Sequence, residues 1–232
     1  MNHSDFLSHP LTAGEKTWGL RYLLFQTLFL SPLLQRLNAL LPAPLPQTEV
    51  NLLYFIINLT AVSIIFRDFL LRQLQLLPEL LWKILFVTAV GFMVYHVANF
   101  LMVQLLFALD KDFFSINDAS VAQLVAENFP LMFLCTVVFA PITEECLFRG
   151  LLFRGVYDRS PVFAWLGSAA LFSLAHIVSY IGLFPPKTLL LCFLQYLPAG
   201  ACLAGAYRLS SSILSPILIH AMVNLLGMIA LR

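Results

Sequence analysis

Charged residues are scarce in this sequence, and their scarcity excludes a water-soluble fold. Only 11% of the 232 residues are charged and 60% are hydrophobic, whereas a typical soluble domain carries roughly 25% charged residues. A fold in water cannot hide so much apolar surface. The net charge of +1 at pH 7 gives no basis for binding nucleic acid. We therefore expect an integral membrane protein. Its partners would include the lipid bilayer but no nucleic acid.

Several motifs that would indicate other chemistry are also missing. The 4 cysteines lie in apolar segments without a CxxC pair, which argues against a disulfide framework and a thiolate zinc site. There is no HExxH helix. No serine stands in a nucleophile-like setting beside a histidine, so acyl-enzyme chemistry is disfavoured. The first twenty residues lack an apolar stretch that ends in a small-residue cleavage site, so we expect no removable signal peptide.

Long apolar runs dominate what remains and predict an all-α, polytopic transmembrane helix bundle with about seven spans. Each run has about 17 to 25 residues, enough to cross a hydrocarbon core roughly 30 Å thick. We expect the whole chain, 1–232, to be a single integral membrane domain. The segment 67–83 mixes charges with apolar residues, which favours an interfacial amphipathic helix. The predicted spans are 20–41, 50–66, 84–108, 128–148, 161–183, 187–207 and 211–231.

The distribution of lysine and arginine predicts the orientation. With seven spans, nine of the 13 basic residues lie on the side of the N-terminus and four lie on the other side. Cytoplasmic loops are enriched in lysine and arginine. We therefore expect a cytoplasmic N-terminus and a site that opens toward the cytoplasm. The compact seven-span chain favours a bacterial inner (cell) membrane.

The stretch APITEECLFRG places two adjacent carboxylates and an arginine at the end of a predicted span. Ionisable groups inside a membrane are costly and indicate a functional site by default. Glu145 and Arg149 are four residues apart, so one helical face brings them together as an ion pair. Glu144 points about 100° away and lacks that partner, which favours it as a general base. A purely structural network of the three side chains is the alternative.

Two further motifs place polar side chains on other spans. FSLAH carries Phe172 and His176 one helical turn apart, and HAMVN carries His220 and Asn224 in the same way. Each motif alone is equally compatible with packing or an interhelical hydrogen bond. Together they predict one polar pocket that hydrolyses an amide, in which water is activated by a carboxylate and an imidazole and an oxyanion is stabilised by hydrogen-bond donors.

A metal site is the alternative chemistry for the same residues. Imidazole and carboxylate side chains bind zinc, and a catalytic zinc needs three protein ligands and a water molecule. Glu144, His176 and His220 would supply those ligands. The spacing of the motifs does not decide between zinc-bound water and water that is activated by glutamate alone.

The three motifs resemble those of a known family. EECLFRG resembles the EExxxR motif, FSLAH the FxxxH motif and HAMVN the HxxxN motif of the CAAX protease and bacteriocin-processing (CPBP, Abi) intramembrane proteases, which include the type II CAAX prenyl endopeptidases. The similarity covers residues 125–232, which would be the catalytic core. It implies a glutamate-dependent peptidase without a cofactor, with zinc as the alternative.

The resemblance also implies a role for each residue. Glu144 would be the catalytic glutamate, His176 its partner in activating water, and His220 and Asn224 the oxyanion stabilisers. The supporting motif residues would be Glu145, Arg149 and Phe172.

The substrate is not defined by these motifs. The resemblance implies a membrane-associated protein or peptide, cut by CAAX-type proteolysis, by removal of a C-terminal sorting tail or by bacteriocin processing. A non-catalytic membrane scaffold or a bacteriocin self-immunity protein is the alternative function. A small transporter is disfavoured, because the sequence lacks paired broken helices and inverted hydropathy symmetry.

Overall fold

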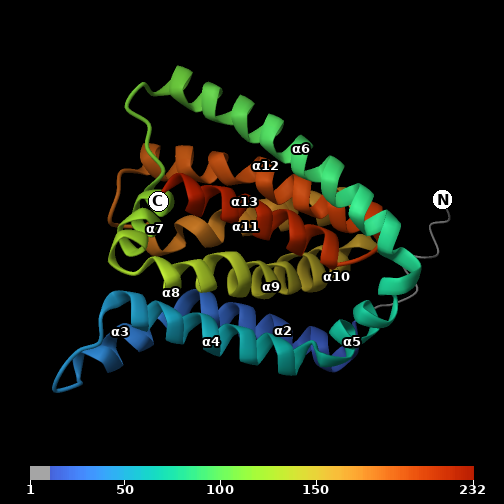
Figure 1. The fold of residues 1–232 in the computed structure, drawn as a ribbon, viewed down its shortest axis with the longest axis horizontal. Helices are drawn as coiled ribbons and strands as arrows, with labels where there is room; N and C mark the ends of the chain where they lie inside the picture. The colour runs from blue at the N-terminus through green and yellow to red at the C-terminus, as the bar shows by residue number, and fades with distance from the viewer. Residues whose placement is uncertain (1–10) are drawn as a thin grey trace.

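The computed structural model describes residues 11–232, which form a bundle of helices (Figure 1). Within that range there is no strand, and an isolated bridge joins Ile181 and Phe184. The predicted all-α class is therefore confirmed. In chain order the elements are α2 (Ala13–Phe25), η1 (Gln26–Leu30), α3 (Ser31–Ala39), α4 (Gln47–Ile65), α5 (Arg67–Gln75), α6 (Leu77–Leu109), α7 (Ile116–Glu127), α8 (Phe129–Phe133), η2 (Leu134–Phe139), α9 (Ala140–Glu145), η3 (Cys146–Phe153), α10 (Arg154–Tyr157), α11 (Pro161–Ile177), η4 (Val178–Tyr180), α12 (Pro186–Ser210) and α13 (Leu214–Ala230).

Many of these helices are long and apolar enough to cross a membrane. Five meet that description by length and composition, and α13 is a shorter apolar helix. The segments α2, η1 and α3 follow one another without a break beside α4 (Figure 1). Counting that segment and α13, about seven spans is a plausible total, as predicted. The five long helices are Gln47–Ile65, Leu77–Leu109, Phe129–Tyr157, Pro161–Tyr180 and Pro186–Ser210.

The predicted interfacial helix at 67–83 is wrong in its extent. The helix α5 ends at Gln75, and α6 begins at Leu77 and continues through the next predicted span. Pro78 occupies the first turn of α6, where a missing backbone N–H costs nothing and the fixed φ suits a helix. Pro78 therefore lies in the first turn of a long helix.

The predicted end of the fourth span is also wrong. Instead of stopping at residue 148, the helical path runs from Phe129 to Tyr157. Asn128 caps its start, because its side chain accepts a hydrogen bond from the backbone N–H of Leu131. Charged residues inside this path do not end it, since they neutralise one another within the protein, as described below.

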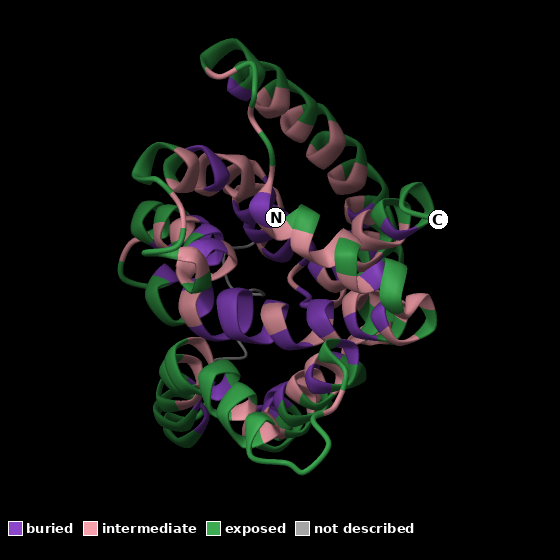
Figure 2. Cartoon of the chain, turned by 90° about the vertical axis from the view of Figure 1, so that its left-hand side faces the viewer, coloured by how far each residue is buried: buried purple, intermediate pink, exposed green. Residues whose placement is uncertain are grey.

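The helical path of residues 129–157 lies at the centre of the bundle (Figure 1). The α2 and α4 helices cover one side of it, and α11, α12 and α13 cover the other. The α6 helix packs outside α12 and α13. Buried residues gather along the central path, whereas the outer faces of α6 and of α2 to α4 are largely exposed (Figure 2). Large apolar side chains such as Trp82, Phe86 and Phe29 lie on those faces, as expected where a protein contacts lipid.

Small residues bring α11 and α12 into close contact. A Cβ atom added at Gly200 would lie 2.7 Å from the Cα atom of Ala169. That distance is too short for the backbones to stay where they are. Gly200 thus permits the close helix packing that small residues provide in membranes.

We expect Gly200→Ala to lower the free energy of unfolding by about 1 to 3 kcal/mol, because the added methyl group forces α11 and α12 apart. Gly167→Ala on α11 is the matched control, since no atom lies within 4 Å of the Cβ position there. Thermal unfolding in detergent checks both variants. Equal stability of the two variants would show that the α11–α12 contact tolerates a wider spacing.

Candidate active site

The two adjacent glutamates lie on α9, between the π-helical segments η2 and η3. A π-helical turn contains an extra residue, so it changes the direction of the side chains that follow, and such turns are frequent at functional sites. Glu145 points into the protein and has no exposed surface. Glu144 instead lines a cavity, with 25% of its side chain exposed. The two carboxylates therefore have different surroundings, buried protein for Glu145 and the cavity for Glu144, although they are neighbours in sequence.

Glu145 belongs to a fully buried polar network. Its Oε2 atom lies 3.1 Å from Nε of Arg149, which confirms the predicted pair, and both side chains have no exposed surface. Nδ1 of His220 lies 3.0 Å from the other oxygen, Oε1. Arg149 also donates to the carbonyl oxygen of Gly200 at 3.2 Å and lies over the ring of Phe172, with its Cζ atom 4.4 Å from the centroid. Each charge thus has a partner, as buried charges require.

Glu144 and His176 form a second pair, which faces the cavity. The Oε2 atom of Glu144 lies 3.9 Å from Nε2 of His176. The other imidazole nitrogen, Nδ1, lies 2.9 Å from the carbonyl oxygen of Phe172. A carbonyl oxygen only accepts hydrogen bonds, so Nδ1 carries a hydrogen. In neutral His176 the unprotonated nitrogen is therefore Nε2, which is directed toward Glu144.

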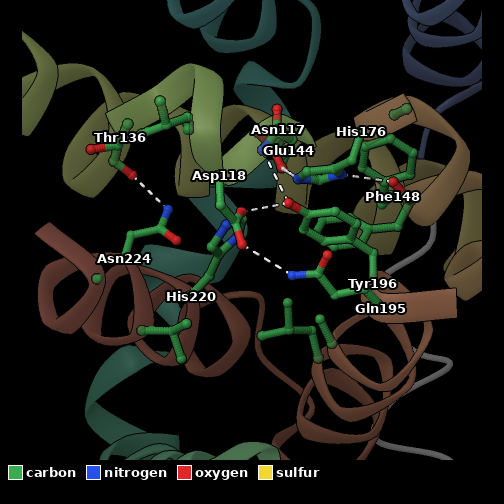
Figure 3. A pocket seen from close by; sticks show the side chains of 18 of the residues that line it. Asn117, Asp118, Thr136, Glu144, Phe148, His176, Gln195, Tyr196, His220 and Asn224 are labelled. Atoms are coloured by element: carbon green, nitrogen blue, oxygen red, sulfur yellow. Dashed lines mark hydrogen bonds and ion pairs between the residues drawn. The ribbon is translucent and has the colours of Figure 1, made fainter. Parts of the chain in front are cut away.

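Two polar side chains lie on α13, opposite this pair. Asn224 donates from Nδ2 to the carbonyl oxygen of Thr136 at 2.7 Å, which leaves its second amide hydrogen available. His220 uses Nδ1 for Glu145, so Nε2 is its remaining nitrogen. Both residues line the same cavity as Glu144 and His176, and Figure 3 shows them there.

The cavity has a volume of about 660 Å³ and gathers most of the predicted site. Glu145 and Arg149 are not part of its lining and support it from behind. Thus the structure brings the three motifs together, as the sequence indicated. The predicted residues in the lining are Glu144, Phe172, His176, His220 and Asn224.

The cavity extends toward the end of the bundle that lies opposite the start of α2. Its lining includes Asn117 on α7 and Leu231 near the C-terminus, at one end of the bundle (Figure 1). The start of α2 lies at the other end, where Glu15 accepts a hydrogen bond from the backbone of Phe69 on α5. The orientation in the membrane, with a cytoplasmic N-terminus and a site that opens toward the cytoplasm, stays a prediction.

Sequence reasoning missed a set of polar residues at the cavity mouth. Tyr196 on α12 stacks on His176, with ring centroids 4.2 Å apart and an angle of 24° between the planes. Its hydroxyl donates to Asp118 on α7 at 2.7 Å and accepts from Asn117 at 3.1 Å. Figure 3 shows Tyr196 between Asp118 and His176. The signal in the sequence is the polar pair Gln195–Tyr196 within an otherwise apolar helix.

We expect Tyr196→Phe to lower kcat about tenfold with little change in KM, because the ring still covers His176 but loses a hydrogen bond to a carboxylate. The matched control is Tyr180→Phe, which removes a hydrogen bond of 3.0 Å to Ser120 on the same α7 helix, outside the cavity. An equal loss of kcat in both variants would mean that Tyr196 only holds α7 in place.

Zinc stays an alternative for these residues, because Glu144, His176 and His220 line one cavity. Among residues 11–232, no group of three or more histidine, cysteine, aspartate or glutamate side chains is arranged to hold a metal ion. Nδ1 of His220 contacts Glu145 and leaves Nε2 directed at the cavity, an arrangement that metal-bound histidines also show. We derive no chemical step through a metal.

Comparison with known proteins supports the family resemblance. Residues 126–226 match the family model described as type II CAAX prenyl endopeptidase Rce1-like. The UPF0177 protein YbdI of Lactococcus lactis subsp. lactis (strain IL1403) is 25% identical over 180 residues, which cover 77% of this chain and 90% of that protein. No solved structure matches the chain. The predicted resemblance is thus confirmed for the region that carries the three motifs.

Proposed function

Because residues 126–226 match an Rce1-like peptidase family, we propose that this chain is an intramembrane endopeptidase in which Glu144 and His176 activate the hydrolytic water. The approach of Glu144 Oε2 to within 3.9 Å of His176 Nε2, at the wall of a cavity, carries this proposal. The separation is too long for a direct hydrogen bond. A water molecule beside the pair can contact both atoms.

The proposed reaction begins with proton transfer from that water to the Glu144 carboxylate. The water oxygen forms a bond to the scissile carbonyl carbon, and the carbonyl electron pair moves onto its oxygen. The carbon–nitrogen bond then breaks, and the leaving amine takes the proton from Glu144. His176 holds the water through Nε2, because its Nδ1–H is fixed on the Phe172 carbonyl.

His220 and Asn224 supply the hydrogen bonds for the oxyanion in this scheme. Asn224 contributes the amide hydrogen that does not face Thr136. His220 can donate from Nε2 when both ring nitrogens carry a hydrogen, with Nδ1–H directed at Glu145. The buried Glu145–Arg149 pair thus orients and balances a group that touches the substrate.

The proposed substrate is a membrane-associated protein or peptide that enters the cavity from the bilayer. We propose three reactions for this substrate: CAAX-type proteolysis, removal of a C-terminal sorting tail, or bacteriocin processing. A non-catalytic scaffold or self-immunity protein is the second candidate function. The network of Glu145, Arg149 and His220 favours it, since such a network also holds helices together.

The test is cleavage of reporter peptides by the purified protein in lipid vesicles. The panel contains prenylated C-terminal peptides, peptides with a membrane-anchoring C-terminal tail and precursors with a leader segment. We expect cleavage of at least one class that persists in a strong chelator. Loss of cleavage in the chelator would replace the glutamate mechanism by zinc, and absence of all cleavage would favour the scaffold.

A further inference from the structure

No lysine or arginine lines the active-site cavity among the described residues. The side chains that line it include the carboxylates of Asp118 and Glu144. A group of like charge that enters a low-dielectric site is strongly disfavoured, whereas a neutral or opposite charge is accepted. The cavity therefore has an intrinsic charge preference.

The nearest cations are committed elsewhere. Arg149 is fully buried behind the wall in its pair with Glu145. At the end of the bundle where the cavity opens, Lys187 lies 2.7 Å from Asp110, and Arg232 lies over the ring of Phe129 at 5.4 Å from its centroid. None of the three lines the cavity, and none forms an ion pair with Asp118.

Asp118 is the exposed member of the two carboxylates. Its oxygens accept hydrogen bonds from the Tyr196 hydroxyl at 2.7 Å and from Gln195 Nε2 at 3.0 Å. Both donors are neutral, and Asp118 forms no ion pair with any of the described residues. Its negative charge at the mouth is therefore free to attract a cation.

The cavity also offers unused hydrogen-bonding atoms to a peptide backbone. Oε1 of Gln195 and Nε2 of His96 are buried atoms without a hydrogen-bond partner, and Asn99 adds an amide side chain to the same lining. Buried polar atoms without partners are costly. A peptide segment that lies across the cavity would satisfy them with its N–H and C=O groups.

From this charge distribution we infer that the cavity takes an internal, neutral or basic peptide segment, with Asp118 pairing with a lysine or arginine of the substrate, and rejects a free C-terminal carboxylate next to the cleaved bond. This inference rests on the proposed function and narrows its substrate class. A short C-terminal tripeptide that ends in a carboxylate would bring a third negative charge beside Glu144 and Asp118.

Three peptides with one sequence and one membrane anchor test the inference. In the first, the cleaved bond is followed by three residues and a free carboxylate; in the second, by the same residues and a C-terminal amide; in the third, by a longer continuing chain. We expect kcat/KM for the first to be at least about tenfold below that for the other two at low salt. The difference should shrink as ionic strength rises. Equal or faster cleavage of the free carboxylate would overturn the inference.

Variants of Asp118 test its role at the mouth. With a lysine in the substrate segment, Asp118→Lys should lower kcat/KM, and a glutamate in place of that lysine should restore it. The matched control is Asp112→Asn, which removes an exposed carboxylate outside the cavity at the same end of the bundle. An unchanged substrate preference in Asp118→Lys would contradict the proposed pairing.

Competition binding of the same peptides separates this inference from the proposed function. A preference for the amide over the carboxylate in binding, without any cleavage, would retain the charge inference and contradict the peptidase. Cleavage without a charge preference would retain the peptidase and contradict the inference. Absence of both binding and cleavage would contradict both.

Discussion

Replacing Glu144 by glutamine is expected to lower kcat for reporter cleavage by a factor of about 10² to 10⁴, the usual contribution of a general base. The amide keeps the shape of the side chain but cannot take a proton from water. The side chain lies at the cavity wall, with 25% of its surface exposed and its nearest ionic partner 3.9 Å away. We therefore expect little change in thermal unfolding.

The control for this substitution is Glu127→Gln, which makes the same change at an exposed position on α7 outside the cavity. Cleavage by Glu144→Gln at the wild-type rate would eliminate the proposed mechanism. A loss of folding together with activity would instead identify Glu144 as part of a structural network, as the scaffold function requires.

His176 provides a further check on whether the pair acts as a unit. Removing either member of a cooperating pair costs about as much as removing both. We expect Glu144→Gln combined with His176→Ala to be no slower than the worse single variant. Additive losses would show that the imidazole and the carboxylate act in separate steps.

Local spacing was enough to predict part of this site. The four-residue separation of Glu145 and Arg149 places them on one helical face, and the structure pairs them at 3.1 Å. The same rule predicted that Glu144 points elsewhere. These relations lie within one helix, so the sequence contains them directly.

Spacing within one helix could not predict the contacts between helices. The approach of His220 to Glu145 joins residues 75 positions apart, and the hydrogen bond from Tyr196 to Asp118 joins residues 78 positions apart. Helical periodicity gives the direction of a side chain on its own helix and leaves the choice of neighbouring helix open. The motif resemblance assigned Glu145 and His220 to one site, whereas Asp118 and Tyr196 lie outside the motifs.

The misplaced end of the fourth span has a physical cause of the same kind. A cluster of charges in an apolar sequence usually indicates the membrane surface. Here Arg149 and Glu145 are fully buried and compensate each other inside the bundle, so the helix continues to Tyr157. A charge that has a buried partner does not mark the end of a span.

Replacing Arg149 by methionine is expected to cause the largest loss of stability in the chain, about 3 to 5 kcal/mol, because it leaves Glu145 buried without its cation. The same change removes the hydrogen bond to Gly200 and the contact with the ring of Phe172. Thermal unfolding in detergent, with Arg159→Met as the exposed control, measures the effect.

Two further variants separate charge from shape in that network. Arg149→Lys keeps the positive charge near Glu145 but loses the planar guanidinium that also reaches Gly200 and Phe172, so its stability should lie between those of the wild type and Arg149→Met. Glu145→Gln combined with Arg149→Met removes both charges, and it should be less destabilised than the sum of the single changes. Wild-type stability in Arg149→Met would show that a buried carboxylate is tolerated here without its cation, and would remove the physical basis for assigning Glu145 a supporting role behind His220.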